Sequence, residues 1–197
     1  MLHRPKKVTW MFLILFLLFV VPLMLASWLS YTKNPFSSHT TNLGELIQPP
    51  LDLNQLILSD NKKIKANHWL LLYVNPAVCD KQCKKILYNI RQVRTATGKD
   101  MNRVERAILT FSDSPADPHL EALLKTEFAG TLHWITAKQN FTTWLQNDPN
   151  ALKIVLQDGG IYIADPLGNA MMFYPTQSDP MDMFKDLTHL LKLSHIG

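Results

Sequence analysis

The segment from Trp10 to Leu29 contains no charged side chain, and most of its residues are large and apolar. A helix of about 20 residues spans roughly 30 Å, the thickness of the hydrocarbon core of a bilayer. Trp10 at one end, with Trp28 and Tyr31 at the other, fits the aromatic belts found at membrane interfaces. We therefore predict a transmembrane anchor at residues 10–29, which removes this segment from any soluble fold.

A cleaved secretory signal peptide is the alternative interpretation of this segment. Signal peptides usually have a shorter apolar stretch of about 7–15 residues, followed by an A-x-A-like cleavage site. Here the apolar stretch is longer, and the candidate site at Ala26 has Met24 at its −3 position. The sequence therefore favours a retained anchor.

Basic residues are unevenly placed around the anchor. Arg4, Lys6 and Lys7 precede it, whereas Lys33 is the only charged residue between the anchor and Glu45. The positive-inside rule then puts the N-terminus in the cytoplasm and the remainder of the chain outside. For a bacterial chain, we expect a single-pass protein of the inner membrane with its domain in the periplasm.

The net charge of +4 does not indicate a nucleic-acid partner. Three of the excess positive charges precede the anchor, and the others are mixed with acidic residues along the chain. We therefore expect no nucleic-acid binding. After the anchor, the chain has room for one domain of ordinary size. The predicted organisation is a cytoplasmic N-terminus at 1–9, the anchor at 10–29, a linker at 30–44 and a domain at 45–197.

The run from His68 to Asn75 is continuously apolar in its interior and is ended by Pro76. Such a run is typical of a strand buried on both faces of a sheet. A helix is predicted from Cys79 to about Thr97, because apolar residues recur there at helical spacing and Gly98 follows as a stop. The remaining predicted elements are a short edge strand or turn at 51–58, a strand at 106–111, a helix at 118–128, a strand at 132–136, a short helix at 140–146, a β-hairpin at 159–175 and a helix at 180–193.

Strands that alternate with helices predict an α/β domain with a central sheet covered by helices on both faces. The hairpin is expected to add an antiparallel pair at one end of the sheet. A pair of cysteines at the first strand-to-helix junction makes this the layout of a thioredoxin-like fold.

The chain has two cysteines, Cys79 and Cys83, in the pattern C-x-x-x-C. At the start of a helix, backbone N–H groups and the helix dipole favour the thiolate, the form that attacks disulfides and binds metals. Nearby lysines add to this effect, and Asp80 opposes it. One helical turn puts the two Cα atoms on the order of 6 Å apart, within disulfide range.

We therefore predict Cys79 and Cys83 as the catalytic residues, with Cys79 as the more exposed nucleophile and Cys83 as the resolving thiol. The alternatives are a static structural disulfide and two buried thiols. A disulfide that closes so short a loop restricts the unfolded chain little, which makes a purely structural role inefficient.

Three features resemble the Sco/SenC family: a strand ending Tyr-Val-Asn-Pro, the C-x-x-x-C at a helix start, and the hairpin sequence Ile-Tyr-Ile-Ala-Asp-Pro-Leu-Gly-Asn. Members of this family are membrane-anchored, thioredoxin-like proteins involved in building the copper sites of cytochrome c oxidase. The resemblance implies a copper ligand set that includes Cys79 and Cys83. It also implies a partner at the inner membrane, either an oxidase subunit or a copper-assembly protein.

The sequence departs from the family pattern at the copper site. In the family, the third copper ligand is a histidine a few residues before the hairpin strand. The matching stretch here, Leu156 to Gly160, contains no histidine. Two glycines also stand where thioredoxins place a proline, directly before Ile161. Copper at Cys79 and Cys83 would therefore need a third donor that the sequence does not identify.

Other soft or nitrogen donors have simpler interpretations. His133 reads as an ordinary half-exposed histidine on a strand, and the methionines of the hairpin and last helix read as core or partner-surface residues. The leading prediction is thiol–disulfide exchange that assists assembly of the oxidase copper site. The alternatives are a Cu(I) metallochaperone that uses the same cysteines, and a non-catalytic assembly factor with a permanent disulfide.

Overall fold

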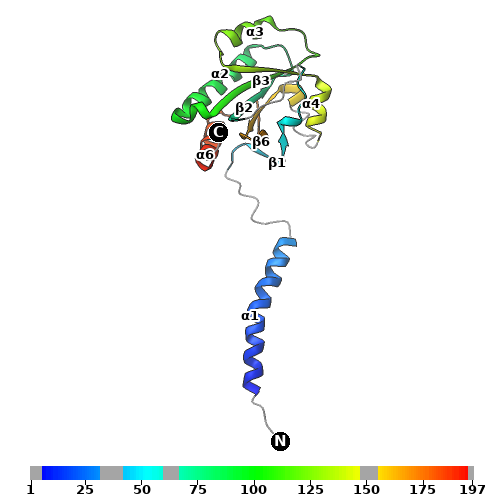
Figure 1. Ribbon diagram of the computed structural model, residues 1–197, viewed down its shortest axis with the longest axis vertical. Coiled ribbons are helices and arrows are strands. Elements are labelled where there is room, and N and C mark those ends of the chain that lie inside the picture. Colours follow the sequence, from blue (N-terminus) through cyan, green and yellow to red (C-terminus); the bar gives the residue numbers. More distant parts are fainter. Residues whose placement is uncertain (1–5, 32–41, 60–66, 147–154, 195–197) are drawn as a thin grey trace. The chain divides into compact units, whose positions relative to one another are not determined.

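A computed structural model describes residues 6–31, 42–59, 67–146 and 155–194. The chain divides into two compact units, Met1–Thr41 and Asn42–Gly197. The first contains a single described helix and the second contains all the described strands (Figure 1).

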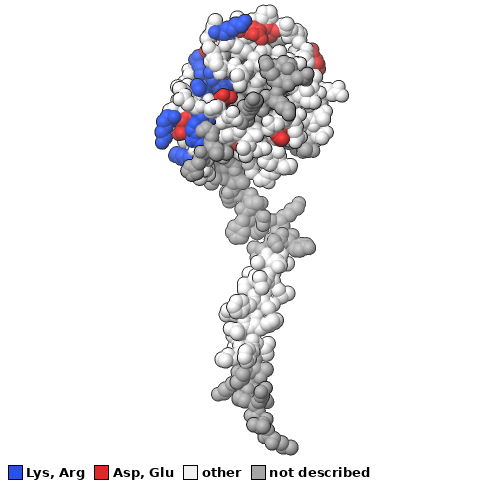
Figure 2. All heavy atoms as spheres, viewed as in Figure 1, with Lys and Arg blue, Asp and Glu red and all other residues white. Residues whose placement is uncertain are grey.

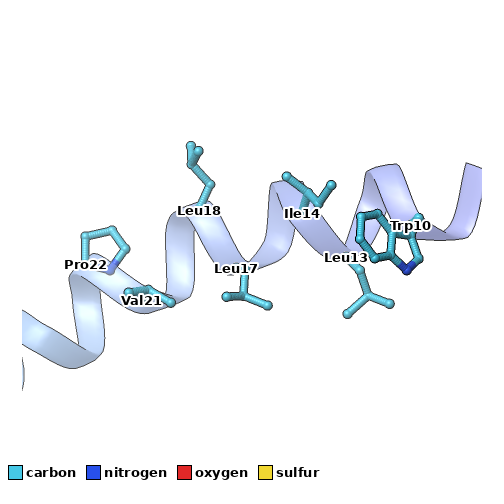
Figure 3. Close-up of a pocket in the computed structure, with 7 residues that line it drawn as sticks. All are labelled: Trp10, Leu13, Ile14, Leu17, Leu18, Val21 and Pro22. Atoms are coloured by element: carbon cyan, nitrogen blue, oxygen red, sulfur yellow. The ribbon is translucent and has the colours of Figure 1, made fainter.

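Helix α1, Lys6–Tyr31, is long and apolar enough to cross a membrane over Trp10–Trp28. Its described side chains carry no charge (Figure 2), and the core of the structure buries none of this stretch. Figure 3 shows apolar side chains that project from successive turns and leave a shallow groove along the helix surface, including Trp10 and Pro22. A helix that is apolar all round and unburied over this stretch fits a membrane anchor.

In the described part of the second unit, six strands form one mixed sheet in the order β1-β6-β5-β2-β3-β4. Strands β2, β3 and β4 run parallel to one another, while β5 lies antiparallel to β2 and β6, and β6 lies antiparallel to β1. The strand bounds are β1 Glu45–Asp52, β2 Trp69–Val74, β3 Val104–Phe111, β4 Thr131–Thr136, β5 Gly160–Ala164 and β6 Asn169–Pro175.

Helices cover both faces of this sheet (Figure 1). The apolar sides of α2, α3 and α6 pack in one core cluster, and α4 packs in a second cluster with the leucines around the 3-10 turn η1. The bounds are η1 Leu53–Gln55, α2 Lys81–Ala96, the 3-10 turn η2 Gly98–Arg103, α3 Pro118–Lys125, α4 Lys138–Trp144 and α6 Pro180–Leu193. The predicted α/β arrangement and the order of its elements are confirmed.

Several element boundaries differ from the prediction, among them those of α2, α3, α4 and the edge strand. Helix α2 begins at Lys81 rather than at Cys79, because the carboxylate of Asp80 accepts the Cys83 N–H and makes Asp80 the N-cap. The edge strand β1 begins at Glu45 and overlaps only residues 51 and 52 of the predicted 51–58 segment, and η1 follows it. Prolines 49 and 50 are tolerated in β1 because an edge strand needs fewer ladder hydrogen bonds.

A buried carboxylate ties the start of the second unit to its last helix. Asp186 of α6 accepts hydrogen bonds from the N–H groups of Leu43 and Gly44 at 2.8 and 2.9 Å, and from the hydroxyl of Tyr174 at 2.6 Å. Gly44 lies so close to the Tyr174 ring that a Cβ there would overlap it. This contact fixes where the chain enters the sheet.

Candidate functional site

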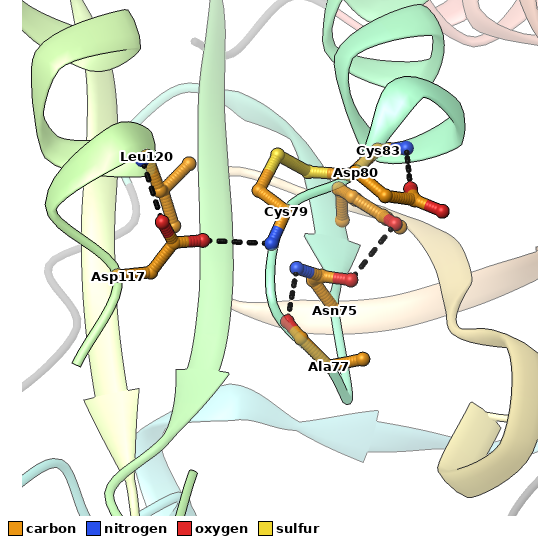
Figure 4. The surroundings of a disulfide bond; sticks show 8 residues. Asn75, Ala77, Cys79, Asp80, Cys83, Asp117 and Leu120 are labelled. Atoms are coloured by element: carbon orange, nitrogen blue, oxygen red, sulfur yellow. Dashed lines mark hydrogen bonds between the residues drawn. A yellow bond between two sulfur atoms is a disulfide. The ribbon is translucent and has the colours of Figure 1, made fainter. Parts of the chain in front are cut away.

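The two predicted site residues meet in the structure. Cys79 and Cys83 form a disulfide with their Cα atoms 5.1 Å apart, at the junction between β2 and α2 (Figure 4). This separation agrees with the one-turn spacing expected from the C-x-x-x-C pattern. The site therefore holds the oxidised form of the predicted pair.

Both cysteines are buried. Cys79 exposes 5% of its surface and Cys83 exposes 1%, and both pack in the core cluster that also contains Tyr73 and Leu120. Cys79 is the more exposed of the two, as predicted, but the core covers most of its surface as well. Its neighbour Val78 exposes 51%, so the loop that carries Cys79 lies at the surface.

Asp80 sets the position of each sulfur relative to α2. As the N-cap, it places Cys79 before the helix and Cys83 in the first turn, where its carboxylate accepts the Cys83 N–H at 2.9 Å. Cys83, rather than Cys79, thus lies nearest the positive end of the helix dipole. Lys84, expected to favour the thiolate, is paired with Glu127 at 2.8 Å.

Asp117 is a residue of the site that the sequence analysis missed. One carboxylate oxygen accepts the Cys79 N–H at 2.7 Å, and the other caps α3 by accepting the Leu120 N–H at 3.0 Å (Figure 4). Burial raises the pKa of this carboxyl, but the N–H groups of Cys79, Leu120 and His119 outweigh it and hold the pKa below its ordinary value. Asp117 therefore remains charged at neutral pH and joins α3 to the cysteine loop. An aspartate directly before a proline is a helix-start signal that could have identified it.

Asn75 shapes the other side of the same loop. Its side chain is buried, donates to the Ala77 carbonyl at 2.7 Å and accepts from the Tyr73 hydroxyl at 3.2 Å. Burial, and then the negative charge of Asp80, raises the pKa of Tyr73 above its ordinary value. Tyr73 is therefore a neutral donor that orders the turn between β2 and Cys79.

Gly159 lies where the hairpin passes the end of β2. It has a φ of +80°, and a Cβ there would lie 2.6 Å from the Val74 carbonyl and 3.3 Å from both Pro76 and the Tyr73 ring. Only glycine combines this backbone conformation with so close an approach. The two glycines noted in the sequence thus bring the hairpin against the strand that leads to Cys79.

Among the described residues, no His, Asp or Glu side chain forms a metal-binding group with the sulfur pair. Gln157 and Asp158 are exposed, and the described residues contain no group of three or more His, Cys, Asp or Glu side chains placed to bind a metal. The residues around the disulfide therefore do not form a complete copper site of the kind implied by the resemblance.

The other donors considered have structural partners. His133 is half-buried and hydrogen-bonds Glu121 and Thr110, each at 2.9 Å, in agreement with its interpretation as an ordinary strand histidine. Met172 and Met183 are core residues. Among the described residues, His133 is not part of a group of His, Cys, Asp or Glu side chains placed to bind a metal.

Comparisons with solved structures identify the fold. Yeast Sco1 is 12% identical, with a TM-score of 0.53 and coverage of 74% of this chain and 94% of that chain. Copper-bound ScoI of Arabidopsis thaliana is 12% identical, with a TM-score of 0.52 and coverage of 77% and 99%. Apo Sco1 of Thermus thermophilus is 14% identical, with a TM-score of 0.52 and coverage of 78% and 99%. The predicted thioredoxin-like fold and its Sco-like form are confirmed.

A further similar structure is BsSco, described as a member of the Sco family of cytochrome c oxidase assembly proteins with a disulfide switch. BsSco is 12% identical to this chain, with a TM-score of 0.50 and coverage of 79% of this chain and 98% of that chain. No curated protein matches the sequence. A family model described as "Transmembrane-like, thioredoxin-like, C-terminal domain" matches residues 69–194. This match covers more than half of the sequence, and the chain belongs to that family of transmembrane-like, thioredoxin-like C-terminal domains.

Proposed function

We propose that this protein is a membrane-tethered thiol–disulfide exchange protein that acts on the copper-site cysteines of a partner during assembly of cytochrome c oxidase. The observation that carries this proposal is the Cys79–Cys83 disulfide at the β2–α2 junction of a thioredoxin-like fold. The anchor at residues 10–29 would hold the domain at the inner membrane, on its periplasmic side. The fold shared with Sco proteins supports the choice of partner.

The exchange proceeds in two balanced steps. A thiolate of the partner attacks Sγ of Cys79, the less buried sulfur, and the electron pair of the broken S–S bond passes to Cys83. A second partner thiolate then attacks the mixed disulfide and releases Cys79 as a thiolate. The partner is oxidised by two electrons and the Cys79–Cys83 pair is reduced; in the reverse direction, Cys79 attacks first and Cys83 resolves.

The position of Cys83 suits its role in this chemistry. It lies in the first turn of α2, where the helix dipole stabilises the thiolate that leaves when the disulfide opens. Because both sulfurs are buried, exchange also requires the loop before α2 to open locally. The hydrogen bond from the Cys79 N–H to Asp117 and the Asn75 contact with Ala77 are the interactions that oppose this opening.

A non-catalytic assembly factor with a permanent disulfide is the second candidate, and the burial of both cysteines favours it. Cu(I) transport by the reduced pair is a weaker proposal, because no His, Asp or Glu side chain among the described residues forms a metal-binding group with the sulfurs. Titration of the reduced full-length protein with Cu(I) tests it: tight one-to-one binding that needs both thiols would support transport, and its absence would support exchange.

Trapping in cells tests the proposed exchange. The Cys83→Ser variant should accumulate a mixed disulfide between Cys79 and its partner, because the resolving thiol is missing. The Cys79→Ser variant should trap nothing and should lose oxidase assembly, while the double variant controls for non-specific adducts. Normal oxidase activity in the Cys79→Ser strain, together with no adduct in the Cys83→Ser strain, would favour the static disulfide.

The membrane arrangement is tested separately. A C-terminal fusion to a phosphatase that folds only in the periplasm should be active if the domain lies outside the cytoplasm. Reversal of the charges at Arg4, Lys6 and Lys7 should reduce that activity, because these residues are predicted to keep the N-terminus inside. Equal phosphatase activity in the wild-type and charge-reversed fusions would contradict the predicted orientation of the anchor.

A further inference from the structure

Arg106 is a buried cation with incomplete hydrogen bonding. Only 6% of its surface is exposed, and its Nε and Nη1 atoms have no hydrogen-bond partner among the residues that the structure describes. Its Nη2 donates to the Ala129 carbonyl at 2.9 Å. Burying a charge without a counter-charge costs free energy, so a negatively charged partner would stabilise this guanidinium.

Two more arginines gather at the same place. Arg91 of α2 donates to the Glu127 carbonyl at 2.7 Å, two residues from the carbonyl that Arg106 contacts. Arg94 of α2 donates to the carbonyl of Val104, two residues before Arg106 on β3, at 2.6 Å. We call Arg91, Arg94 and Arg106 the arginine cluster.

The three cations influence one another electrostatically. Burial lowers the pKa of Arg106, and the charges of Arg94 and then Arg91 lower it further. The charges of Arg94 and Arg91 therefore disfavour the charged form of the partly desolvated Arg106. This repulsion would be relieved by an anion that contacts the cluster.

The acidic side chains nearest in sequence to these contacts are engaged elsewhere. The Glu127 carboxylate pairs with Lys84 at 2.8 Å, and the Glu105 carboxylate lies 3.4 Å from His68. Helix α2 itself contains five basic residues and no acidic one, and Figure 2 shows Lys and Arg gathered on the side of the domain where Figure 1 places α2. Arg91 and Arg94 are only half-buried, so the cluster can be approached from solvent on their side.

We propose that the arginine cluster is a binding site for a phosphate group, either free inorganic phosphate or the phosphate of an anionic lipid headgroup. Planar guanidinium forks match the oxygens of a phosphate and form short, charge-assisted hydrogen bonds with them. Arg91 and Arg94 provide the more exposed donors, and Arg106 adds a buried positive charge. The proposal does not depend on the function of the disulfide.

The first test compares full-length protein and the Arg106→Met variant in an uncharged, phosphate-free detergent. Thermal unfolding is followed with inorganic phosphate or chloride at equal ionic strength. In chloride, the variant should unfold at the same temperature as the wild type or higher, because it lacks the unpaired buried charge. Saturating phosphate should raise the unfolding temperature of the wild type but not that of the variant. The wild type should then unfold at the higher temperature of the two.

Two further variants keep the test decisive if Arg106→Met does not fold. The Arg91→Gln, Arg94→Gln double variant changes half-buried residues and should bind phosphate at least tenfold more weakly. Lys85→Met removes one positive charge from an exposed site on the same helix and should leave phosphate affinity unchanged. Equal phosphate effects in the wild type and the double variant would overturn the proposal.

Thermal unfolding in nanodiscs of phosphatidylglycerol distinguishes lipid phosphate from free inorganic phosphate as the ligand. If the lipid is the ligand, the wild type but not the double variant should be protected there, and added inorganic phosphate should give no further shift. If free phosphate is the ligand, it should shift the unfolding temperature equally in detergent and in nanodiscs. If phosphate changes the unfolding temperatures of the wild type and the double variant equally in detergent and in nanodiscs, the cluster is not a phosphate site.

Discussion

At the residue scale, two aspartates hold the cysteine pair through backbone N–H groups rather than through the sulfurs. Asp80 accepts the N–H of Cys83, and Asp117 accepts the N–H of Cys79 while it caps α3. A carboxylate that bonds two backbone donors from different segments fixes those segments relative to each other. Asp117 is therefore one of the residues that oppose opening of the loop with Cys79.

The Asp117→Ala variant should lower the free energy of unfolding by about 1–2 kcal/mol, the usual cost of losing an N-cap. It should also speed reduction of the disulfide by dithiothreitol, because the Cys79 N–H is released. Asp179→Ala is the matched control, since Asp179 caps α6 through the Met181 N–H. The control should lose similar stability without faster reduction, and equal reduction rates in the two variants would contradict the role given to Asp117.

The same carboxylate predicts a pH dependence. Its folded pKa lies below its ordinary value of 3.8, so its contribution to stability is present above about pH 4 and is lost as the pH falls through the folded pKa. The stability difference between the wild type and Asp117→Asn should be constant from about pH 5 to 7 and should narrow below about pH 4. Chemical denaturation across this range measures it, and a difference that stays constant to pH 2 would contradict the assignment.

At the element scale, the contact between the hairpin and the end of β2 depends on Gly159. The Gly159→Ala variant should lose roughly 1–3 kcal/mol, because its Cβ would lie 2.6 Å from the Val74 carbonyl and its φ is +80°. Gly98→Ala is the control: Gly98 also has a positive φ, of +60°, but its Cβ would meet open space. Equal losses in the two variants would show that backbone conformation, and not the close approach, sets the cost.

Most elements could be predicted from the sequence because their hydrophobic periodicity is local. The continuous run of β2 and the amphipathic helix at Pro180–Leu193 were predicted in this way. The predicted start of α2 at Cys79 is two residues too early, because that prediction treats Asp80 only as a charge that opposes a thiolate. Aspartate is also a strong N-cap.

The surroundings of the disulfide were harder to predict. The burial of Cys79 depends on α3 and its Asp117, which lie 38 residues further along the chain. The burial of Arg106 likewise depends on how α2 and the Ala129 turn pack against β3. Neither contact leaves a local pattern in the sequence, so the two cysteines could be predicted as site residues but their accessibility could not.

At the scale of the whole molecule, Asp186 joins the entrance of the domain to its final helix. The Asp186→Ala variant should lose about 3 kcal/mol or more, because it leaves the N–H groups of Leu43 and Gly44 and the Tyr174 hydroxyl without their acceptor. Asp182→Ala, on the same helix, removes only a surface ion pair of 3.5 Å with Lys185 and should change stability by less than about 0.5 kcal/mol. Chemical denaturation in detergent measures the free energy of unfolding of both variants. Equal losses in the two would contradict the anchoring role of Asp186.

The proposed activity depends on whether the Cys79–Cys83 disulfide can be opened by a physiological partner. The direct measurement is its reduction potential, obtained by equilibrating the full-length protein with glutathione or dithiothreitol buffers and counting free thiols. An exchange protein should give a potential between about −270 and −120 mV, the range of known oxidoreductases. A value below about −300 mV would identify a structural disulfide and would contradict thiol–disulfide exchange.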